Sequence, residues 1–412
     1  MRIGTNFPAI SGASIVMTAP VPHANLSRFG SSRRGAAISR PRMTLAASTV
    51  SPTPEPSIPR ISWVPPPGGF AGLSFLNGVL RILTLGVYHF WGKTEVRQRI
   101  WSAVRIDGEP LEYRGTGGEL LRGFLIVFFL ILLPMGLAGF ASSLFLPVTA
   151  QGVYTLVFWG LVFLLSGIGI HRARRYRLSR TRWRGIRGGL SGRSRGFAWT
   201  YLWTMLLVPV TLGWILPWRA VRLQRALFNE TSFGDNGFTF TGVAGPLYRR
   251  FWLVWISGLV LFISASVAFV AIIGFDMPRS GANTPTMRAL TGGKIAALTA
   301  VVLGALLIFA MIRAWYSSRM LNYFAAHTKL QGTGFTLQAT APSLVWLAAS
   351  NYLIRLLSLG FLSAVTEARS MRYIVDRLSC EGAIAWSQIG QNPDVLLRRG
   401  EGLAEAFDVD AF

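Results

Sequence analysis

Long stretches without charge dominate the pattern of hydrophobic and polar positions in this chain. Residues 123–170 contain no charged side chain and are too long for one membrane span of about 20 residues, so they predict two helices joined by a tight turn. Residues 251–275 and 295–312 are also uncharged, and each is long enough for about one span. The pattern therefore predicts two hydrophobic helical hairpins, at residues 123–170 and 251–312, and hence a protein embedded in a membrane.

Three further apolar segments, at residues 70–91, 197–217 and 343–362, are each interrupted by the tripeptide Thr/Ser-Leu-Gly. The interrupting residues include Thr84 and Gly86, Thr211 and Gly213, and Ser358 and Gly360. The first and third segments also contain an arginine close to the break, Arg81 and Arg355. A glycine inside a helix costs about 1 kcal/mol, and an arginine at the bilayer centre costs at least about 2.5 kcal/mol. We therefore expect these segments to be poorer membrane spans than the two hairpins.

Each interruption is followed by a basic segment with helical spacing, and strand-like stretches recur between the apolar segments. The basic segments after the first two breaks contain Trp91 and Trp218, and tryptophan favours the headgroup region of a bilayer. Asp107-Gly108 is a strong signal for the turn of a β-hairpin, and residues 233–242 and 327–337 resemble it. The predicted fold is an all-α polytopic membrane protein with small cytoplasmic β-hairpins. Its repeated unit is a Gly-broken apolar segment, a basic amphipathic helix, a β-hairpin and a transmembrane helix. Such a repeat indicates the pseudo-symmetry of a transporter or a duplicated scaffold.

The charge pattern conflicts with seven equal membrane spans. If every apolar segment crossed once, the basic regions 171–195 and 218–250 would lie on opposite sides of the membrane. The positive-inside rule places both on the cytoplasmic side. One hypothesis is that the three broken segments are re-entrant and the two hairpins supply four crossings, since broken helices are tolerated where protein covers the freed backbone. The alternative is that all seven cross and one basic loop violates the rule.

Composition agrees with a membrane protein. Of the 412 residues, 51% are hydrophobic and only 14% are charged, against roughly 25% in soluble domains. The formal net charge of +24 is compatible with nucleic acid or with an anionic lipid surface. Because the basic residues flank long apolar stretches, we expect anionic lipid headgroups as the partner and no nucleic acid.

The most basic stretch, residues 171–187, contains no acidic residue. Arginine makes bidentate contacts with phosphate, so this stretch is a candidate site for a phosphate or an anionic headgroup. The candidate contacts are Arg174, Arg175, Arg177, Arg184 and Arg187. The alternative interpretation is a topological signal at the lipid surface.

Several of these motifs resemble the YjgN-like family of bacterial inner-membrane proteins, which is built around a domain of unknown function. The resemblance rests on the Thr-Leu-Gly break with Trp91, its copy ending at Trp218, and the stretch from Tyr176 through Trp183 and Gly185. It covers roughly residues 68–385, although His89-Phe90 stands where the family usually has a proline before the tryptophan. The resemblance implies a multi-pass protein of the bacterial inner membrane, and it implies no reaction.

The sequence contains no recognisable catalytic constellation. Its four histidines are isolated and there is a single cysteine, Cys380, so we expect neither an enzyme nor a resident metal or cofactor. Arg81 and Arg355 are the ionisable residues inside apolar segments, where such groups usually have a function. We therefore expect a protein that binds or transports an anionic solute or lipid. The alternative is a membrane scaffold that recruits a soluble partner through its amphipathic helices and β-hairpins.

Composition also divides the chain. Residues 1–66 are rich in Ser, Pro, Ala and Arg and predict a disordered leader, for which Met43 is an alternative start. Residues 67–385 form the predicted membrane domain with internal repeats. Residues 386–412 form an acidic tail, which we expect to be solvated.

Overall fold

The computed structural model describes residues 57–273, 275–276, 286–287 and 292–392. These residues belong to one compact unit, Pro52–Phe412, and the other unit, Met1–Ser51, lies outside the described part of the chain. Most of the predicted leader and of the predicted acidic tail therefore lies outside the described residues.

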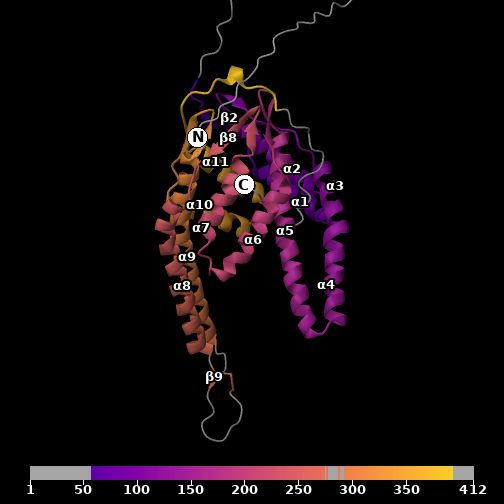
Figure 1. Cartoon of the computed structure of the whole chain (residues 1–412), viewed down its shortest axis with the longest axis vertical. Helices are drawn as coiled ribbons and strands as arrows, with labels where there is room; N and C mark the ends of the chain where they lie inside the picture. The colour runs from indigo at the N-terminus through magenta and orange to yellow at the C-terminus, as the bar shows by residue number, and fades with distance from the viewer. Residues whose placement is uncertain (1–56, 274, 277–285, 288–291, 393–412) are drawn as a thin grey trace, which may run out of the picture. The chain divides into compact units, whose positions relative to one another are not determined.

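Four helices in the described residues are long and apolar enough to cross a membrane. The first is α3 (Gly117–Val127), which continues through a π-helical turn (Phe128–Leu132) into α4 (Leu133–Phe145); the others are α5 (Val148–Arg180), α8 (Gly245–Ile273) and α9 (Gly292–Ala326). Helices α4 and α5 form one antiparallel pair and α8 and α9 the other (Figure 1), as the sequence predicts. Their apolar side chains are largely exposed, which is stable only where hydrocarbon surrounds them.

The three interrupted segments fold as pairs of shorter helices. The pairs are α1 (Ala71–Leu83) with α2 (His89–Ala103), α6 (Ser194–Val210) with α7 (Leu216–Phe228), and α10 (Ala341–Leu357) with α11 (Ser363–Val375). We call these three pairs the first, second and third helical hairpins. They are distinct from the two long hydrophobic pairs, α4 with α5 and α8 with α9. A short turn containing the Thr/Ser-Leu-Gly tripeptide separates the two helices of each, and the helices pack against each other.

The turn of the first hairpin satisfies its own backbone. The Thr84 hydroxyl donates a hydrogen bond to the Leu80 carbonyl (2.7 Å) and accepts one from the Tyr88 amide (2.9 Å). Leu85 has φ +52° and Gly86 has φ +93°, so the chain reverses through two left-handed residues. A leucine in this conformation costs about 1–2 kcal/mol, and glycine avoids that cost because it has no Cβ.

The other two turns have the same geometry. The Thr211 hydroxyl donates to the Leu207 carbonyl (2.8 Å), and the Ser358 hydroxyl donates to the Ile354 carbonyl (2.6 Å). The following leucines, Leu212 and Leu359, have φ values of +50° and +49°. Thr and Ser at this position therefore supply the polar atom that the reversal of the backbone requires.

Short strands at the ends of these helices join into one antiparallel sheet of eight strands, in the order β13-β12-β11-β8-β7-β6-β5-β4. The strands are β4 (Glu112–Tyr113), β5 (Thr181–Trp183), β6 (Ile186–Leu190), β7 (Thr231–Phe233), β8 (Asn236–Phe240), β11 (Thr328–Leu330), β12 (Thr333–Leu337) and β13 (Leu378–Glu381). The sequence predicts separate small hairpins, whereas the structure pairs them edge to edge. Pairing satisfies the free N–H and C=O groups that isolated hairpins would expose.

A smaller sheet contains β1 (Ile61–Trp63), β2 (Val104–Ile106) and β3 (Glu109–Pro110), and a further short pair joins β9 (Phe275–Asp276) and β10 (Thr286–Met287). Strand β1 lies within the predicted leader, so the folded region begins earlier than residue 67. At the other end, Trp386 packs against Trp183 with ring centroids 4.5 Å apart, so the fold also continues past residue 385. Ile61 of the first segment and Trp386 of the second line one apolar cavity with residues of the large sheet.

Candidate functional site

Arg81 and Arg355, the two arginines inside apolar segments, line a single pocket of about 300 Å³. Arg81 lies on α1 and Arg355 on α10, so the pocket is formed where the first and third helical hairpins meet. We call it the hairpin pocket. Sequence reasoning treated the two arginines as candidates for the same anion, and the structure brings them together.

Small and polar side chains hold the two hairpins against each other. The buried Ser74 hydroxyl of α1 donates to the Phe361 carbonyl (2.6 Å) and accepts from the Ala364 amide (3.1 Å). Gly78 lies directly against the Phe361 ring, and any Cβ at this position would overlap it. This contact fixes the distance between α1 and the turn that leads into α11.

In the first and third helical hairpins, an asparagine of the first helix donates a hydrogen bond to the second helix. Asn77 donates to the Gly92 carbonyl (3.3 Å), and Asn351 donates to the Thr366 carbonyl (3.3 Å), in both cases fifteen residues later in the chain. Each arginine follows its asparagine by one helical turn and therefore projects from the same face. The Arg355 Nε donates to the Thr366 hydroxyl (2.7 Å), whereas the Arg81 guanidinium makes no hydrogen bond or ion pair to any described residue.

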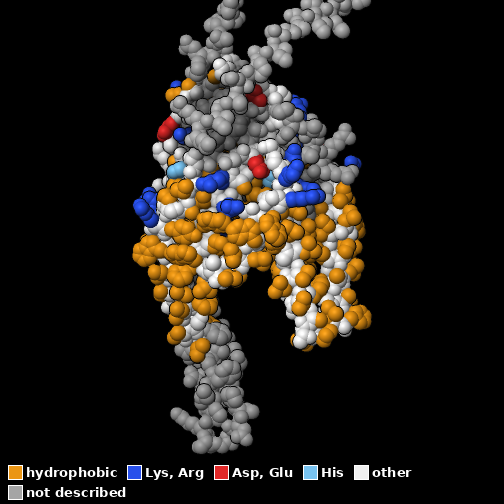
Figure 2. Space-filling view, viewed as in Figure 1, with side chains coloured by type: hydrophobic (Ala, Val, Ile, Leu, Met, Phe, Trp, Pro, Cys, Tyr) orange, Lys and Arg blue, Asp and Glu red, His pale blue; other side chains and the backbone are white. Residues whose placement is uncertain are grey.

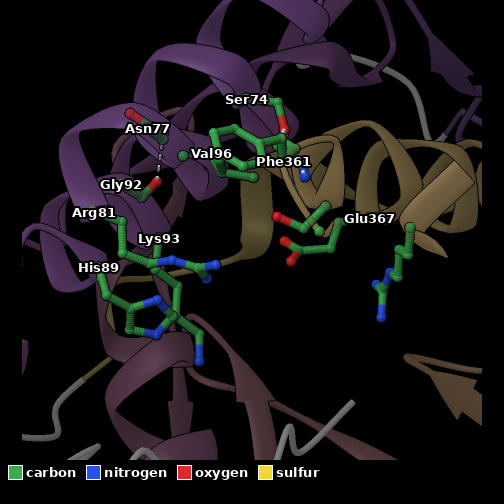
Figure 3. Close-up of a pocket in the computed structure, with 14 residues that line it drawn as sticks. Ser74, Asn77, Arg81, His89, Gly92, Lys93, Val96, Phe361 and Glu367 are labelled. Carbon is green, nitrogen blue, oxygen red and sulfur yellow. Dashed lines mark hydrogen bonds between the residues drawn. The ribbon is translucent and has the colours of Figure 1, made fainter. Parts of the chain in front are cut away.

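The charges around the hairpin pocket are unequal. Lys93 and His89 of α2 lie on the same side as Arg81, and the Glu367 carboxylate of α11 faces them across the pocket (Figure 3). The lining side chains thus include three permanent cations and a single carboxylate. The excess of positive charge favours an anionic ligand, which would gain most where water is excluded.

The five arginines of the basic stretch are not part of this pocket. Arg174 stacks over the Phe228 ring at 4.7 Å, Arg184 pairs with Glu109 (2.8 Å), and Arg187 donates to the Asn392 carbonyl (2.8 Å). Arg175 lines a separate basic depression with His171, and Arg177 follows Arg175 by two residues on the same helix. These contacts join different parts of the protein, namely α7, β3 and the segment after β13, so the five arginines do not line one common pocket among those described.

The aromatic motif residues have packing roles. Trp91 stacks on Tyr88 (6.5 Å) next to the first turn, and Trp218 packs on Trp203 (5.3 Å) in the second hairpin. Because both rings follow a turn directly, they anchor the second helix of each hairpin.

The remaining motif residues lie at the end of α5 and in the β5–β6 hairpin that follows it. The buried Tyr176 hydroxyl donates to the Glu119 carboxylate of α3. Trp183 is 1% exposed and lies in the core of the large sheet. Gly185 has φ +76° and forms the β5–β6 turn with Arg184, whose φ is +50°. The sequence interpretation did not predict this hairpin.

Sequence reasoning also missed Lys93, Glu367 and the two asparagines. A signal for the asparagines is present: Asn77 and Asn351 precede Arg81 and Arg355 by the same spacing. The second hairpin has Thr204 and Val208 at the corresponding positions before Thr211, so only the first and third hairpins carry the asparagine–arginine pair.

Comparison with known proteins agrees with this architecture. Residues 66–406 match the model of a bacterial protein family of unknown function, DUF898. The chain belongs to this family. A curated relative is the inner membrane protein YjgN of Salmonella typhimurium, which is 24% identical over 145 residues. The match covers 35% of this chain and 33% of YjgN, so the chain aligns with about a third of that relative's length. No solved structure matches the chain. The name of the curated relative and the four apolar helices of the described residues support a membrane protein, and the family description names no activity.

Proposed function

We propose that this DUF898 protein lies in the bacterial inner membrane and binds an anionic group in its hairpin pocket. The anionic group is a phosphate or a carboxylate. The observation that carries the proposal is the meeting of Arg81 and Arg355 in one pocket, although they lie on helices far apart in the sequence. An arginine near hydrocarbon is costly unless it is paired, and the lining supplies a single carboxylate, Glu367, for several cations. An anionic ligand would offset that cost.

We further propose that the chain crosses the membrane four times and that the three helical hairpins enter from the side of the large sheet. Strand β6 precedes the second hairpin and pairs with β7, which follows it, at Gly189↔Ser232. The hairpin therefore starts and ends on the same side of the protein. This arrangement places the basic regions 171–195 and 218–250 together, in agreement with the positive-inside rule.

The surface supports this orientation. Hydrophobic side chains cover the part of the molecule that contains α4, α5, α8 and α9, and Lys and Arg side chains gather along its border with the region of the sheet (Figure 2). Such a border matches the interface between hydrocarbon and anionic headgroups. In this proposal, the four long helices cross the membrane, and the repeated unit of broken segment, basic helix and β-hairpin lies on the side of the large sheet.

The tips of the hairpins support insertion into hydrocarbon. Leu85, Leu212 and Leu359 are 95%, 70% and 82% exposed, although each occupies a left-handed position that leucine disfavours. In water, Asn or Gly would be favoured there. In hydrocarbon, an apolar side chain is favourable and the Thr/Ser hydroxyl satisfies the backbone.

Binding to purified protein in nanodiscs would test the proposed function. Inorganic phosphate and nanodiscs that contain dioleoyl phosphatidylglycerol would each be compared with nanodiscs of phosphatidylcholine alone. The comparison distinguishes a soluble anion from a lipid headgroup. We expect the paired variants Arg81→Gln and Arg355→Gln to weaken binding at least about tenfold, since a hydrogen bond to a charged group contributes about 1.5–3 kcal/mol.

The matched control is Arg122→Gln, which removes an exposed arginine of α3 that does not line the pocket. Binding of both probes that is unchanged in the Arg81 and Arg355 variants would reject the proposal. Equal losses in Arg122→Gln would show that only the overall charge matters.

A further inference from the structure

We propose that a groove between α7, α8 and α9 binds one anionic phospholipid, with its phosphate at Arg219 and Arg313 and one acyl chain along α8. The groove has a volume of about 570 Å³ and shares no residue with the hairpin pocket. We call it the lipid groove. The proposal goes beyond anion binding by Arg81 and Arg355, because it specifies a different site and a ligand with an apolar chain.

Positive charge marks one end of the lipid groove. Arg219 on α7 is half-buried, and its guanidinium carbon lies 4.6 Å from the centre of the Tyr201 ring. Its Nε is buried and has no hydrogen-bond partner in the described part of the chain. Arg313 on α9 lines the same groove. No Asp or Glu is among the residues that line the groove, so an anionic ligand would find no competing carboxylate there.

A buried hydroxyl at the same end also lacks a partner. Tyr316 on α9 is 7% exposed and packs its ring on Phe251, with centroids 5.3 Å apart. Tyr316 is one of the residues that line the groove, and its buried hydroxyl makes no hydrogen bond to any described residue. A buried hydroxyl is normally hydrogen-bonded. A phosphate oxygen held by the two arginines would accept this bond.

The rest of the lipid groove is apolar and long. Its wall on α8 runs from Phe251 through Val254 to Phe262, about 16 Å at about 1.5 Å per residue. Phe309 of α9 closes the opposite side by packing on Gly258, where a Cβ would lie 3.1 Å from the ring. Phe262 is 71% exposed, so the apolar end opens laterally towards the surroundings of α8. An acyl chain can enter by this route from the bilayer.

The combination selects an anionic phospholipid. A free phosphate would satisfy the arginines and leave the apolar wall uncovered, whereas a zwitterionic headgroup would bring a second cation to a site without a carboxylate. The order of groups also fits the bilayer. Arg313 directly follows the uncharged stretch 295–312, so it lies at the end of the apolar part of α9, and an acyl chain would extend along that part.

Native mass spectrometry and thermal unfolding of delipidated protein would test the lipid groove. Dioleoyl phosphatidylglycerol, dioleoyl phosphatidylcholine and inorganic phosphate would be added separately. We expect one phosphatidylglycerol to be retained and to raise the unfolding temperature, with at least about tenfold weaker retention of phosphatidylcholine and no effect of phosphate at this site. Arg219→Gln with Arg313→Gln should abolish that preference. Equal retention of the two lipids by the wild-type protein would overturn the proposal.

Tyr316→Phe separates lipid binding from folding. The variant removes a hydroxyl that is unpaired without lipid and keeps the ring packing, so lipid-free stability should be unchanged or higher. The stabilisation by phosphatidylglycerol should nevertheless fall severalfold. Arg249→Gln, which replaces an exposed residue of α8 outside the groove, should leave this stabilisation unchanged. If phosphatidylglycerol stabilised Tyr316→Phe and the double arginine variant as much as the wild-type protein, the lipid groove would be refuted. This result would not bear on the hairpin pocket.

Discussion

Leu85→Asp tests the environment of a hairpin tip, because hydrocarbon and water predict opposite signs. Leu85 is 95% exposed, so its removal loses almost no packing within the protein. In hydrocarbon, leucine is favourable by about 0.3–0.6 kcal/mol and aspartate unfavourable by about 2.5–3.5 kcal/mol at the bilayer centre. The substitution should then destabilise the protein by about 3 kcal/mol, and by less if the tip is shallower.

In water the same substitution should stabilise the protein slightly. The backbone at position 85 is left-handed, with φ +52°, and aspartate tolerates this conformation better than leucine does. The free energy of unfolding would be measured by reversible denaturation in bicelles. A Leu85→Asp protein that is as stable as the wild type, or more stable, would refute insertion of the first hairpin.

Accessibility of a spin label to a polar relaxation agent would give the depth of the tip directly. The chain has one cysteine, so Cys380→Ser provides the background for a single label. A nitroxide at position 85 should resemble one at Phe140, which is on α4 and 66% exposed. It should differ from one at Gln331, in the exposed turn between β11 and β12.

Two further predictions concern the region of the sheet. Trp386→Ala should lower the free energy of unfolding by about 2–3 kcal/mol, because the ring stacks on Trp183 and its Nε1 donates to Asp107 (3.1 Å). This loss is smaller than the loss expected for a fully buried tryptophan. Denaturant titration would measure it, with Trp386→Phe as the control. Burial, and next the nearby Asp107 carboxylate, raise the pKa of the Cys380 thiol, so its alkylation by iodoacetamide near pH 8 should be slower than that of an exposed thiol. Asp107→Asn should lower this pKa and speed alkylation, and an unchanged rate would contradict the effect of the carboxylate.

The sequence predicted the long helices and the breaks because both are local properties. A run without charge is visible along residues 123–170, and Thr84 with Gly86 marks a reversal without reference to any other segment. The β5–β6 hairpin was missed because its sequence lacks the usual local signal of a turn. Its turn places Arg184 at φ +50°, where Asn or Asp is usual, and the arginines around it drew attention to charge.

The hairpin pocket depends on contacts that no local pattern contains. Arg81 and Arg355 could be singled out individually, because each is a cation in an apolar segment. Their meeting depends on the bond from the Ser74 hydroxyl to the Phe361 carbonyl, across 287 residues of sequence. Lys93 and Glu367 were missed because, on an isolated amphipathic helix, they look like ordinary surface charges.

The order of the strands has a consequence for biogenesis. The eight strands of the large sheet lie side by side in the order in which they are translated, so each new strand finds the preceding strand of the sheet already made. The sheet can therefore grow while later helices are still entering the membrane. Its final contacts come from the end of the described chain, where Asn392 donates to Ser232 (2.8 Å) and Trp386 stacks on Trp183. Ribosome-bound chains that end before residue 386 should therefore carry all eight strands without the contacts of Trp386 and Asn392, which leaves Trp183 less covered and more accessible to chaperones and proteases.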